Sequence, residues 1–327
     1  MQGGENVVVK VRRPGVAEIV ARLAQTMERR SALAAKSGVA GLAEESTNDF
    51  QDELDYANEV NNAREIALAT KSYEDVVVPH FYAELSSARV VVMERLEGTA
   101  VGDLEPDPAA AVQRRMLADS LFEAEIGAMI NGDRFRTDPH PGNIFVLEDG
   151  RIGLIDSGAA GRLDAAERAA VTNILLALRL RDPTLPRQAA LEVATIDEEA
   201  DPAQLERAFA QLMAKHLGPG AQPNAGMLRE FLIIMLDFGL KPPPSTMSLL
   251  RAMGTLDGTL LMLSPGFNLI DAAEDLAGVE MQKWLEPGSM KDLLEREAIQ
   301  LAPMLWRFPA TWTGSRLRSN EENSRPG

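Results

Sequence analysis

The sequence has no cysteine, only three histidines and no long apolar run, and these gaps exclude several classes of protein. Without cysteine the chain can form neither a disulfide framework nor a thiolate metal site, which suits a reducing compartment. Three histidines in 327 residues are too few for most histidine-based metal sites. We find no signal peptide and no uninterrupted apolar stretch of about 18 residues. We therefore expect a cytoplasmic protein, with peripheral attachment to a membrane as an alternative.

Basic residues are in the minority. The chain carries 33 lysines and arginines against 49 aspartates and glutamates, a formal net charge of −16. Nucleic-acid binding needs a basic face that neutralises phosphates, so we expect no nucleic-acid partner. With 45% hydrophobic and 25% charged residues, the remaining composition is ordinary for a globular protein. The length is sufficient for two lobes with a sizeable core.

The first hundred residues predict a small lobe of mixed α and β structure. Runs of β-branched residues that end at turn signals predict strands, and apolar residues at helical spacing predict helices. Thr47 or Asn48 is expected to cap the second helix. The expected strands are 7–11, 76–78 and 88–93, the expected helices are about 16–36 and 48–69, and residues 94–98 are expected to leave the sheet as a linker.

The chain changes character after Pro108. The pair Asp149-Gly150 favours a tight turn, so residues 144–147 and 152–155 are expected to form a β-hairpin. The expected order is a helix over 109–130, a loop over 136–143, the hairpin, helices from 164 to about 303, and a polar, partly disordered tail. The expected domains are an N-terminal lobe at 1–98, a C-terminal lobe at 99–305 and the tail at 306–327.

Asp138, Asn143 and Asp156 form the most informative spacing in the chain. Asn143 follows Asp138 by five residues, and Asp156-Ser157-Gly158 begins thirteen residues after Asn143. Mg²⁺ and Mn²⁺ prefer hard oxygen ligands, so Asp156 at a strand end and the amide oxygen of Asn143 are candidate ligands for a phosphate-bound metal.

Asp138 would face the attacking group and orient or deprotonate it. Asp-(four residues)-Asn followed by Asp-x-Gly is the catalytic and metal-binding layout of the protein-kinase superfamily. The alternative is structural: Asp138 caps a turn, and Asp156 only ends a hairpin.

Four motifs in the same order resemble the UbiB/AarF family of atypical kinases, over roughly residues 1–165. They are the lysine strand and its Pro-Gly exit at 9–16, the Glu-x-Asp helix at 53–61, the hinge at 78–98, and the segments 135–143, 155–158 and 161–163. The resemblance implies an α+β, two-lobed protein-kinase-like fold. Its mixed N-terminal lobe would be small and truncated, and its helical C-terminal lobe enlarged.

The resemblance also assigns roles in the first lobe. Lys10 would contact the α- and β-phosphates of ATP and pair with Glu59 on the second helix. The alternative for Lys10 is protection of an edge strand against aggregation. Glu53 and Asp55 would form an inhibitory or selectivity pair, and the alternative for them is a solvated helix face.

The sequence departs from the family pattern in several places. The family's N-terminal extension and Ala-rich nucleotide loop precede the lysine strand, whereas Met1 lies only nine residues before Lys10. We therefore expect both to be absent and ATP turnover to be slow. Arg136 stands where histidine is usual, and Ser157 where phenylalanine is usual, which alters packing behind the metal site without removing a ligand. His140, between two prolines, is expected to form structural hydrogen bonds.

The resemblance implies ATP- and Mg²⁺-dependent phosphotransfer or hydrolysis linked to isoprenoid-quinone (ubiquinone-type) lipid metabolism. An isoprenoid lipid or an anionic membrane surface would then be a partner beside ATP. Two alternatives stay open: a small-molecule phosphotransferase of the aminoglycoside/choline kinase type, and a non-catalytic pseudokinase scaffold. The aromatic and basic residues from Trp306 to Arg318 suit either a membrane interface or a packed helix. The methionines of the helical lobe suit core filling, with a lipid groove as the alternative.

Overall fold

The computed structural model describes residues 6–16, 18, 19, 22, 26, 55–132, 134–196, 201–218 and 226–285, with side chains up to 281. The chain divides into two compact units after Ala277, and apart from the end of α10 everything below concerns the first unit. Glu53, the expected cap at Thr47 or Asn48, and the tail from Trp306 lie outside the described residues, as does most of the helix expected over 16–36.

The described elements alternate in the first half of the chain and become almost entirely helical in the second. The strands are β1 (Val7–Val11), β2 (Val76–Val77), β3 (Val90–Glu94), β4 (Gly98–Ala100), β5 (Phe135–Arg136), β6 (Ile144–Leu147), β7 (Ile152–Leu154), β8 (Ala160–Gly161), β9 (Thr195–Ile196) and β10 (Leu240–Lys241). The α-helices are α3 (Tyr56–Ala69), α4 (Ala111–Asn131), α5 (Ala165–Leu180), α6 (Thr184–Val193), α7 (Pro202–Leu217), α8 (Gly226–Asp237), α9 (Pro244–Leu263) and α10 (Leu269–Leu285). Short 3₁₀ helices are η2 (Ala83–Leu85), η3 (Val101–Asp103), η4 (Pro108–Ala110) and η5 (Pro141–Asn143).

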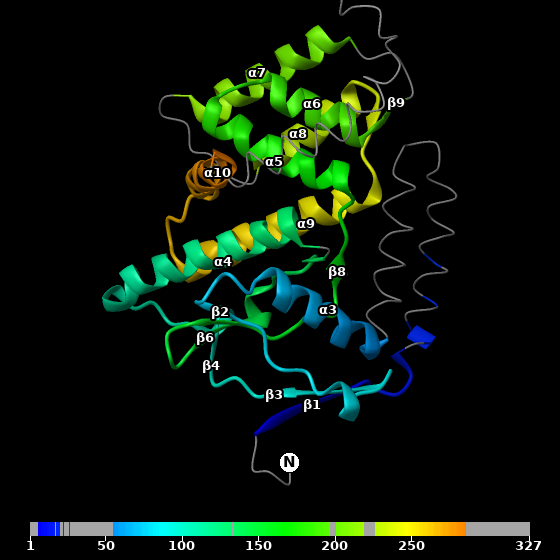
Figure 1. The fold of residues 1–327 in the computed structure, drawn as a ribbon, viewed down its shortest axis with the longest axis vertical. Helices are drawn as coiled ribbons and strands as arrows, with labels where there is room; N and C mark the ends of the chain where they lie inside the picture. The colour runs from blue at the N-terminus through cyan, green and yellow to red at the C-terminus, as the bar shows by residue number, and fades with distance from the viewer. Residues whose placement is uncertain are drawn as a thin grey trace, which may run out of the picture. The chain divides into compact units, whose positions relative to one another are not determined.

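The small lobe pairs β1 with β3 and packs α3 on β3 (Figure 1). The two strands are antiparallel, and Lys10 lies opposite Val91. A small apolar core joins strand and helix, made of Val60, Ala63, Phe81, Val91 and Met93. The predicted strand at 7–11 is confirmed, and that at 88–93 is found two residues later, at 90–94.

Helix α3 begins later than the sequence predicts. Asp55 has an extended backbone, with φ −101° and ψ 98°, and its carboxylate accepts a hydrogen bond from the backbone N–H of Ala57 at 3.0 Å. Such a residue is an N-cap that ends the preceding segment and starts a new helix. The prediction of one continuous helix over 48–69 is therefore wrong, because Asp55 interrupts it.

A second sheet has four strands in the order β2-β7-β6-β4. The predicted hairpin is confirmed as β6 and β7, with Gly150 at φ +86° in its turn. The predicted linker at 94–98 is confirmed over 95–97, which connect β3 to a strand of another sheet. Only Gly98 differs from the prediction, because it already belongs to β4 and lies opposite Leu147 of β6. A Cβ at Gly98 would lie 2.4 Å from the carbonyl oxygen of Val146, so only glycine permits this approach.

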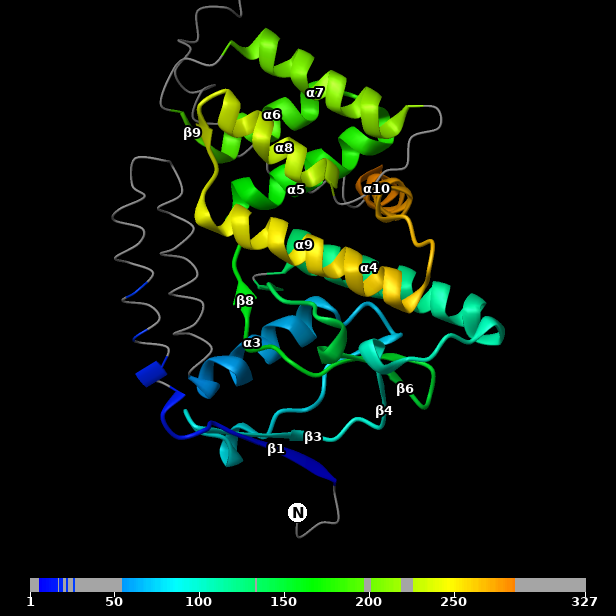
Figure 2. The ribbon, with the colours of Figure 1, turned by 180° about the vertical axis from the view of Figure 1, so that it is seen from behind.

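The helical lobe is built on α4 and α9, which lie side by side in both views (Figures 1 and 2). The predicted helix at 109–130 is confirmed by η4 and α4. Helix α5 starts at a capping box, in which Asp164 and Glu167 each accept a backbone N–H of the other residue. The predicted helical remainder is confirmed through α10, apart from the short antiparallel pair β9–β10. The main core joins this lobe to the four-stranded sheet.

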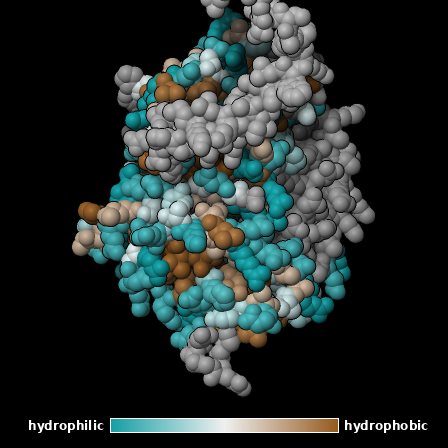
Figure 3. Space-filling view, viewed as in Figure 1, coloured by the Kyte–Doolittle hydropathy of each residue, from teal (hydrophilic) through white to brown (hydrophobic). Residues whose placement is uncertain are grey.

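On the face shown in Figure 3 much of the described surface is hydrophilic, and a group of apolar side chains lies below α4. Within the described part of the chain, no helix combines the length and apolar character needed to cross a bilayer.

Candidate nucleotide and metal site

Lys10 joins three segments that are far apart in the sequence. Its Nζ lies 2.9 Å from Glu59 Oε1 and 3.1 Å from Glu59 Oε2, and 3.4 Å from Asp156 Oδ2. Strand β1 supplies the lysine, α3 the glutamate, and the segment after β7 the aspartate. The predicted Lys10–Glu59 ion pair is confirmed, and Asp156 is a second anionic partner. Asp55 caps α3 instead of pairing with Lys10.

The environment of this triad is only partly open to water. The side chain of Glu59 is 2% exposed, whereas those of Lys10 and Asp156 are 34% and 33% exposed. Burial and the neighbouring Asp156 carboxylate raise the pKa of Glu59 above its ordinary value, against the opposing charge of Lys10. Burial alone would lower the pKa of Lys10, but Asp156 and Glu59 outweigh it, so this pKa lies above its ordinary value. Lys10 is therefore held as a cation.

The carboxylate of Asp156 is oriented by its own loop. The backbone N–H of Gly158 donates to Asp156 Oδ1 at 2.9 Å, and a Cβ at Gly158 would lie only 3.2 Å from that oxygen. Asn62 of α3 donates from Nδ2 to the carbonyl oxygens of Ser157 at 3.1 Å and Gly158 at 3.4 Å. The direction of Asp156 thus depends on the backbone of Ser157 and Gly158.

Asp138 lies in a loop whose neighbours are fixed and whose own side chain is exposed. The backbone N–H of Thr137 donates to Ala159 O at 3.1 Å, and Thr259 of α9 donates from Oγ1 to Pro139 O at 2.8 Å. No partner of the Asp138 carboxylate occurs within the described ranges. A carboxylate on an ordered loop, open to solvent, is free to meet an incoming hydroxyl or water.

A backbone hydrogen bond places Asn143 next to the segment that carries Asp156. Its carbonyl oxygen accepts a hydrogen bond from the N–H of Ile155 at 3.1 Å, one residue before Asp156. Its backbone N–H donates to His140 O at 2.8 Å. The side chain of Asn143 is half-buried and forms no hydrogen bond among the described residues. The backbone thus brings Asn143 close to the segment that carries Asp156.

His140 has the structural role expected from its position between two prolines. Its Nδ1 accepts a hydrogen bond from the backbone N–H of Gly142 at 3.1 Å and caps the 3₁₀ helix η5. A nitrogen that accepts carries no proton, so the neutral ring has its proton on Nε2. This histidine thus shapes the loop that carries Asp138, by capping η5.

The donor set fits Mg²⁺ bound together with phosphate. Among the residues that the structure describes, no three His, Cys, Asp or Glu side chains form a metal cluster. Mg²⁺ is ordinarily held by one or two carboxylates, with phosphate oxygens and water completing its shell. Asp156 and Asn143 supply two hard oxygens, and Lys10 supplies positive charge next to them.

A buried ion pair anchors the loop that carries Asp138. Arg136 of β5 lies 2.7 Å from Glu125 of α4 through Nη2, and 2.9 Å through Nε, with the two side chains 2% and 3% exposed. Both charges lie away from water, so each depends on the other. Arg136 also lies opposite Ala160 in the β5–β8 pair. The ion pair thus links α4 to β5, the strand directly before Asp138.

Replacing Glu125 by alanine is expected to lower the free energy of unfolding by about 3–5 kcal/mol, because it leaves the Arg136 guanidinium buried without its anion. Urea denaturation measures this change. Asp119→Ala on the same helix is the matched control, since the Asp119–Arg115 pair is about two-fifths exposed and should contribute about 1 kcal/mol or less. Equal losses for the two variants would contradict the structural role of the buried pair.

Asn62, Thr259 and the Glu125–Arg136 pair were not predicted as part of the site. Asn62 follows Glu59 by three residues, so both lie on one face of the helix. This spacing could have identified Asn62 as a candidate site residue. Thr259 is separated from Pro139 by 120 residues, and no local pattern connects them. Arg136 was noted only as a departure from the family pattern, without its partner.

Comparison with known proteins gives one family and several relatives. The ABC1 atypical kinase-like domain matches residues 1–188. The protein slr0889 of Synechocystis, described as uncharacterized, is 30% identical over 276 residues, which cover 79% of this chain and 68% of that protein. The probable protein kinase UbiB of Pseudomonas entomophila is 26% identical, and the match covers 92% of this chain and 58% of that one.

A plant relative and a solved structure extend the comparison. ACTIVITY OF BC1 COMPLEX KINASE 7, a chloroplast protein of Arabidopsis thaliana, is 25% identical, with 85% of this chain and 41% of that protein covered. The chain thus spans about half the length of UbiB and this kinase. A complex of Rv3197 with erythromycin from Mycobacterium tuberculosis has a TM-score of 0.57 at 22% identity, covering 84% of this chain and 72% of that one. With the domain match, it confirms the predicted two-lobed, kinase-like α+β fold.

Proposed function

The chain belongs to the family of ABC1 atypical kinase-like domains, the UbiB/AarF family, and on that premise we propose that it binds ATP with Mg²⁺ and transfers or hydrolyses the terminal phosphate. The convergence of Lys10, Glu59 and Asp156 carries this proposal. Glu59 is buried, and a buried ion pair adds little to the free energy of folding compared with apolar packing. The presence of such a pair beside Asp156 therefore favours a functional explanation.

Each residue of the site has a distinct task in the proposed reaction. Lys10 binds the α- and β-phosphates, and Glu59 holds its ammonium group in position. Asp156 and Asn143 would hold the metal, which would supply positive charge to the phosphate oxygens. Asp138 orients the attacking hydroxyl or water and accepts its proton. The attacking oxygen bonds to the γ-phosphorus while the bond to the β,γ-bridging oxygen breaks, so that ADP leaves.

The two alternatives fare differently. A phosphotransferase of the aminoglycoside/choline kinase type is disfavoured, because the matched domain is that of the ABC1 family. A pseudokinase scaffold needs the fold but no exposed carboxylate on a fixed loop, and Asp138 is such a carboxylate. The scaffold remains the alternative that turnover measurements on Asp138 variants decide.

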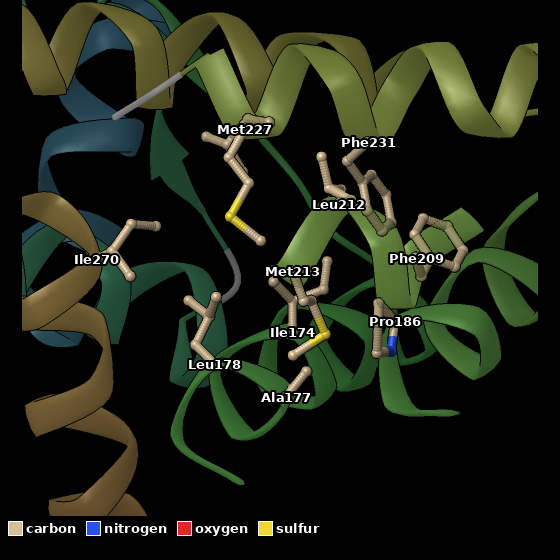
Figure 4. A pocket seen from close by; sticks show the side chains of 11 residues that line it. Ile174, Ala177, Leu178, Pro186, Phe209, Leu212, Met213, Met227, Phe231 and Ile270 are labelled. Carbon is tan, nitrogen blue, oxygen red and sulfur yellow. The ribbon is translucent and has the colours of Figure 1, made fainter. Parts of the chain in front are cut away.

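The lipid partner and the link to isoprenoid-quinone metabolism have weaker support. The helical lobe contains an apolar cavity of about 40 Å³ among α5, α6, α7, α8 and α10 (Figure 4), lined by Ile174, Ala177, Leu178, Pro186, Phe209, Leu212, Met213, Met227, Leu228, Phe231 and Ile270. A cavity of about 150 Å³ accepts a benzene ring. The present cavity is too small for an isoprenoid chain without repacking, so Met213 and Met227 serve here to fill the core. The metabolic link is therefore proposed by family analogy alone.

Replacing Lys10 by methionine is expected to weaken Mg²⁺-ATP binding by about 10- to 100-fold, since hydrogen bonds to charged groups contribute about 1.5–3 kcal/mol. Calorimetric titration with ATP in Mg²⁺, at a temperature where both proteins are folded, measures the change. Lys71→Met, at an exposed position just after α3, is the control. Unchanged affinity in Lys10→Met would remove Lys10 from the nucleotide site and leave it as an edge-strand lysine.

A further inference from the structure

A single face of α3 contacts the candidate site twice. Glu59 reaches the side chain of Lys10, and Asn62, one helical turn later, reaches the backbone after Asp156. Asn62 is 4% exposed, and its amide nitrogen points at two carbonyl oxygens, those of Ser157 and Gly158, at 3.1 and 3.4 Å. Buried carbonyl groups without a hydrogen-bond donor would lower the stability of the fold. The amide of Asn62 satisfies the two carbonyl groups of this turn.

Ser157 cannot anchor this turn by itself. Its side chain is 1% exposed, and its Oγ forms no hydrogen bond with any part of the chain that the structure describes. A hydroxymethyl group buries far less apolar surface than an aromatic ring. The aromatic anchor that is usual at this position is thus missing, and the contact from Asn62 is the direct connection between α3 and the loop backbone.

The loop backbone in turn sets the direction of Asp156. Gly158 donates its N–H to Asp156 Oδ1 at 2.9 Å, and a Cβ at Gly158 would crowd the same oxygen at 3.2 Å. A small shift of the turn therefore changes where the carboxylate points. The connection runs from α3 through Asn62 to the turn, and from the turn to the candidate metal ligand.

We propose that Asn62 is a positioning residue, which holds the turn after Asp156 by its backbone and thereby sets the Mg²⁺ concentration that ATP binding requires. The proposal rests on the proposed function for its metal and nucleotide, and on the hydrogen bonds of Asn62 for its geometry. Asn62 touches neither ligand itself. Because α3 also carries Glu59, one helix positions both the phosphate-binding lysine and the metal-binding loop.

The test uses the 327-residue chain with Asn62→Leu, which keeps a similar volume and removes both donors. Two readouts are taken: hydrogen–deuterium exchange of the segment 155–160 without ligand, and the Mg²⁺ concentration at half-maximal ATP binding. We expect faster exchange in that segment and an increase of about tenfold in the Mg²⁺ requirement, as the loss of two hydrogen bonds implies. ATP affinity at saturating Mg²⁺ should change much less.

Two controls separate positioning from general destabilisation. Asn61→Leu changes the exposed neighbour on α3, and Ser157→Ala removes a hydroxyl without a partner while both Asn62 hydrogen bonds, which go to backbone, remain. Both should behave like the wild type. If Asn62→Leu does not fold, Asn62→Ser, whose hydroxyl is too short to reach the turn, provides the same comparison.

Unchanged exchange over 155–160 would overturn the proposal, whatever ATP does. Faster exchange with an unchanged Mg²⁺ requirement would overturn it too, since the hydrogen bonds would then be structural only. If the wild type shows no Mg²⁺-dependent ATP binding, the proposed function fails and the positioning role with it, while faster exchange would still confirm the hydrogen-bonded link between α3 and the turn.

Discussion

Replacing Asp138 by asparagine is expected to lower the ATP turnover number by about 10²–10⁴-fold, the usual contribution of a general base. Mg²⁺-ATP affinity should stay within about twofold of the wild type, because in the proposed reaction Asp138 faces the attacking group and not the metal. Asparagine keeps the shape of the side chain but cannot accept the proton. The loop should keep its conformation, since Thr137 and Pro139 are held through their own backbone atoms, which the substitution leaves unchanged.

A sensitive phosphate-release assay on purified protein measures this effect, with ATP affinity determined in parallel. Asp149→Asn is the matched control, since Asp149 lies in the exposed hairpin turn and pairs only with Arg151 among the described residues. Equal turnover in Asp138→Asn and the wild type would show that the carboxylate has no role in catalysis. Measurable binding without any turnover in the wild type would favour the scaffold alternative.

Asp156→Asn is expected to remove the Mg²⁺-dependent part of ATP binding. Altering a residue that merely supports a metal ligand commonly weakens metal binding by about 10- to 100-fold, so loss of the ligand itself should exceed about 100-fold. Asparagine can still accept the N–H of Gly158, so the turn should persist. The charge facing Lys10 Nζ at 3.4 Å disappears, but Lys10 keeps Glu59 as its partner.

Thermal shift with ATP in the presence of Mg²⁺ or of a chelator measures this prediction. The wild type should be stabilised by ATP only with the metal, and Asp156→Asn should show no such stabilisation. Asp149→Asn, on the same hairpin and half-exposed, should respond like the wild type. An equal shift in Asp156→Asn and the wild type would exclude Asp156 as the metal ligand.

Local chemistry explains what could be predicted from the sequence. The hairpin at β6 and β7 depends on a turn formed by adjacent residues, and it was predicted to within one residue. Asp138, Asn143 and Asp156 lie within nineteen residues, so their spacing alone suggests a metal and phosphate site. The Lys10–Glu59 pair spans 49 residues and was predicted only through the family resemblance.

Contacts between distant segments explain what could not be predicted. Asn62 contacts Ser157, 95 residues away, and Thr259 contacts Pro139, 120 residues away. No local sequence pattern predicts either contact. Strand β4 (Gly98–Ala100) was not predicted, and the expected linker at 94–98 included its first residue. Its pairing with β6 determines its structure, since strand formation depends strongly on the neighbouring strand.

One measurement tests the central claim most directly: the position of Mn²⁺ in crystals of the protein grown with a non-hydrolysable ATP analogue. An anomalous difference map locates the ion without reference to the protein coordinates. The account predicts a peak about 2.0–2.3 Å from a carboxylate oxygen of Asp156 and from the amide oxygen of Asn143, with the triphosphate next to Lys10. An analogue bound elsewhere, or bound at Lys10 with no metal at Asp156, would contradict it.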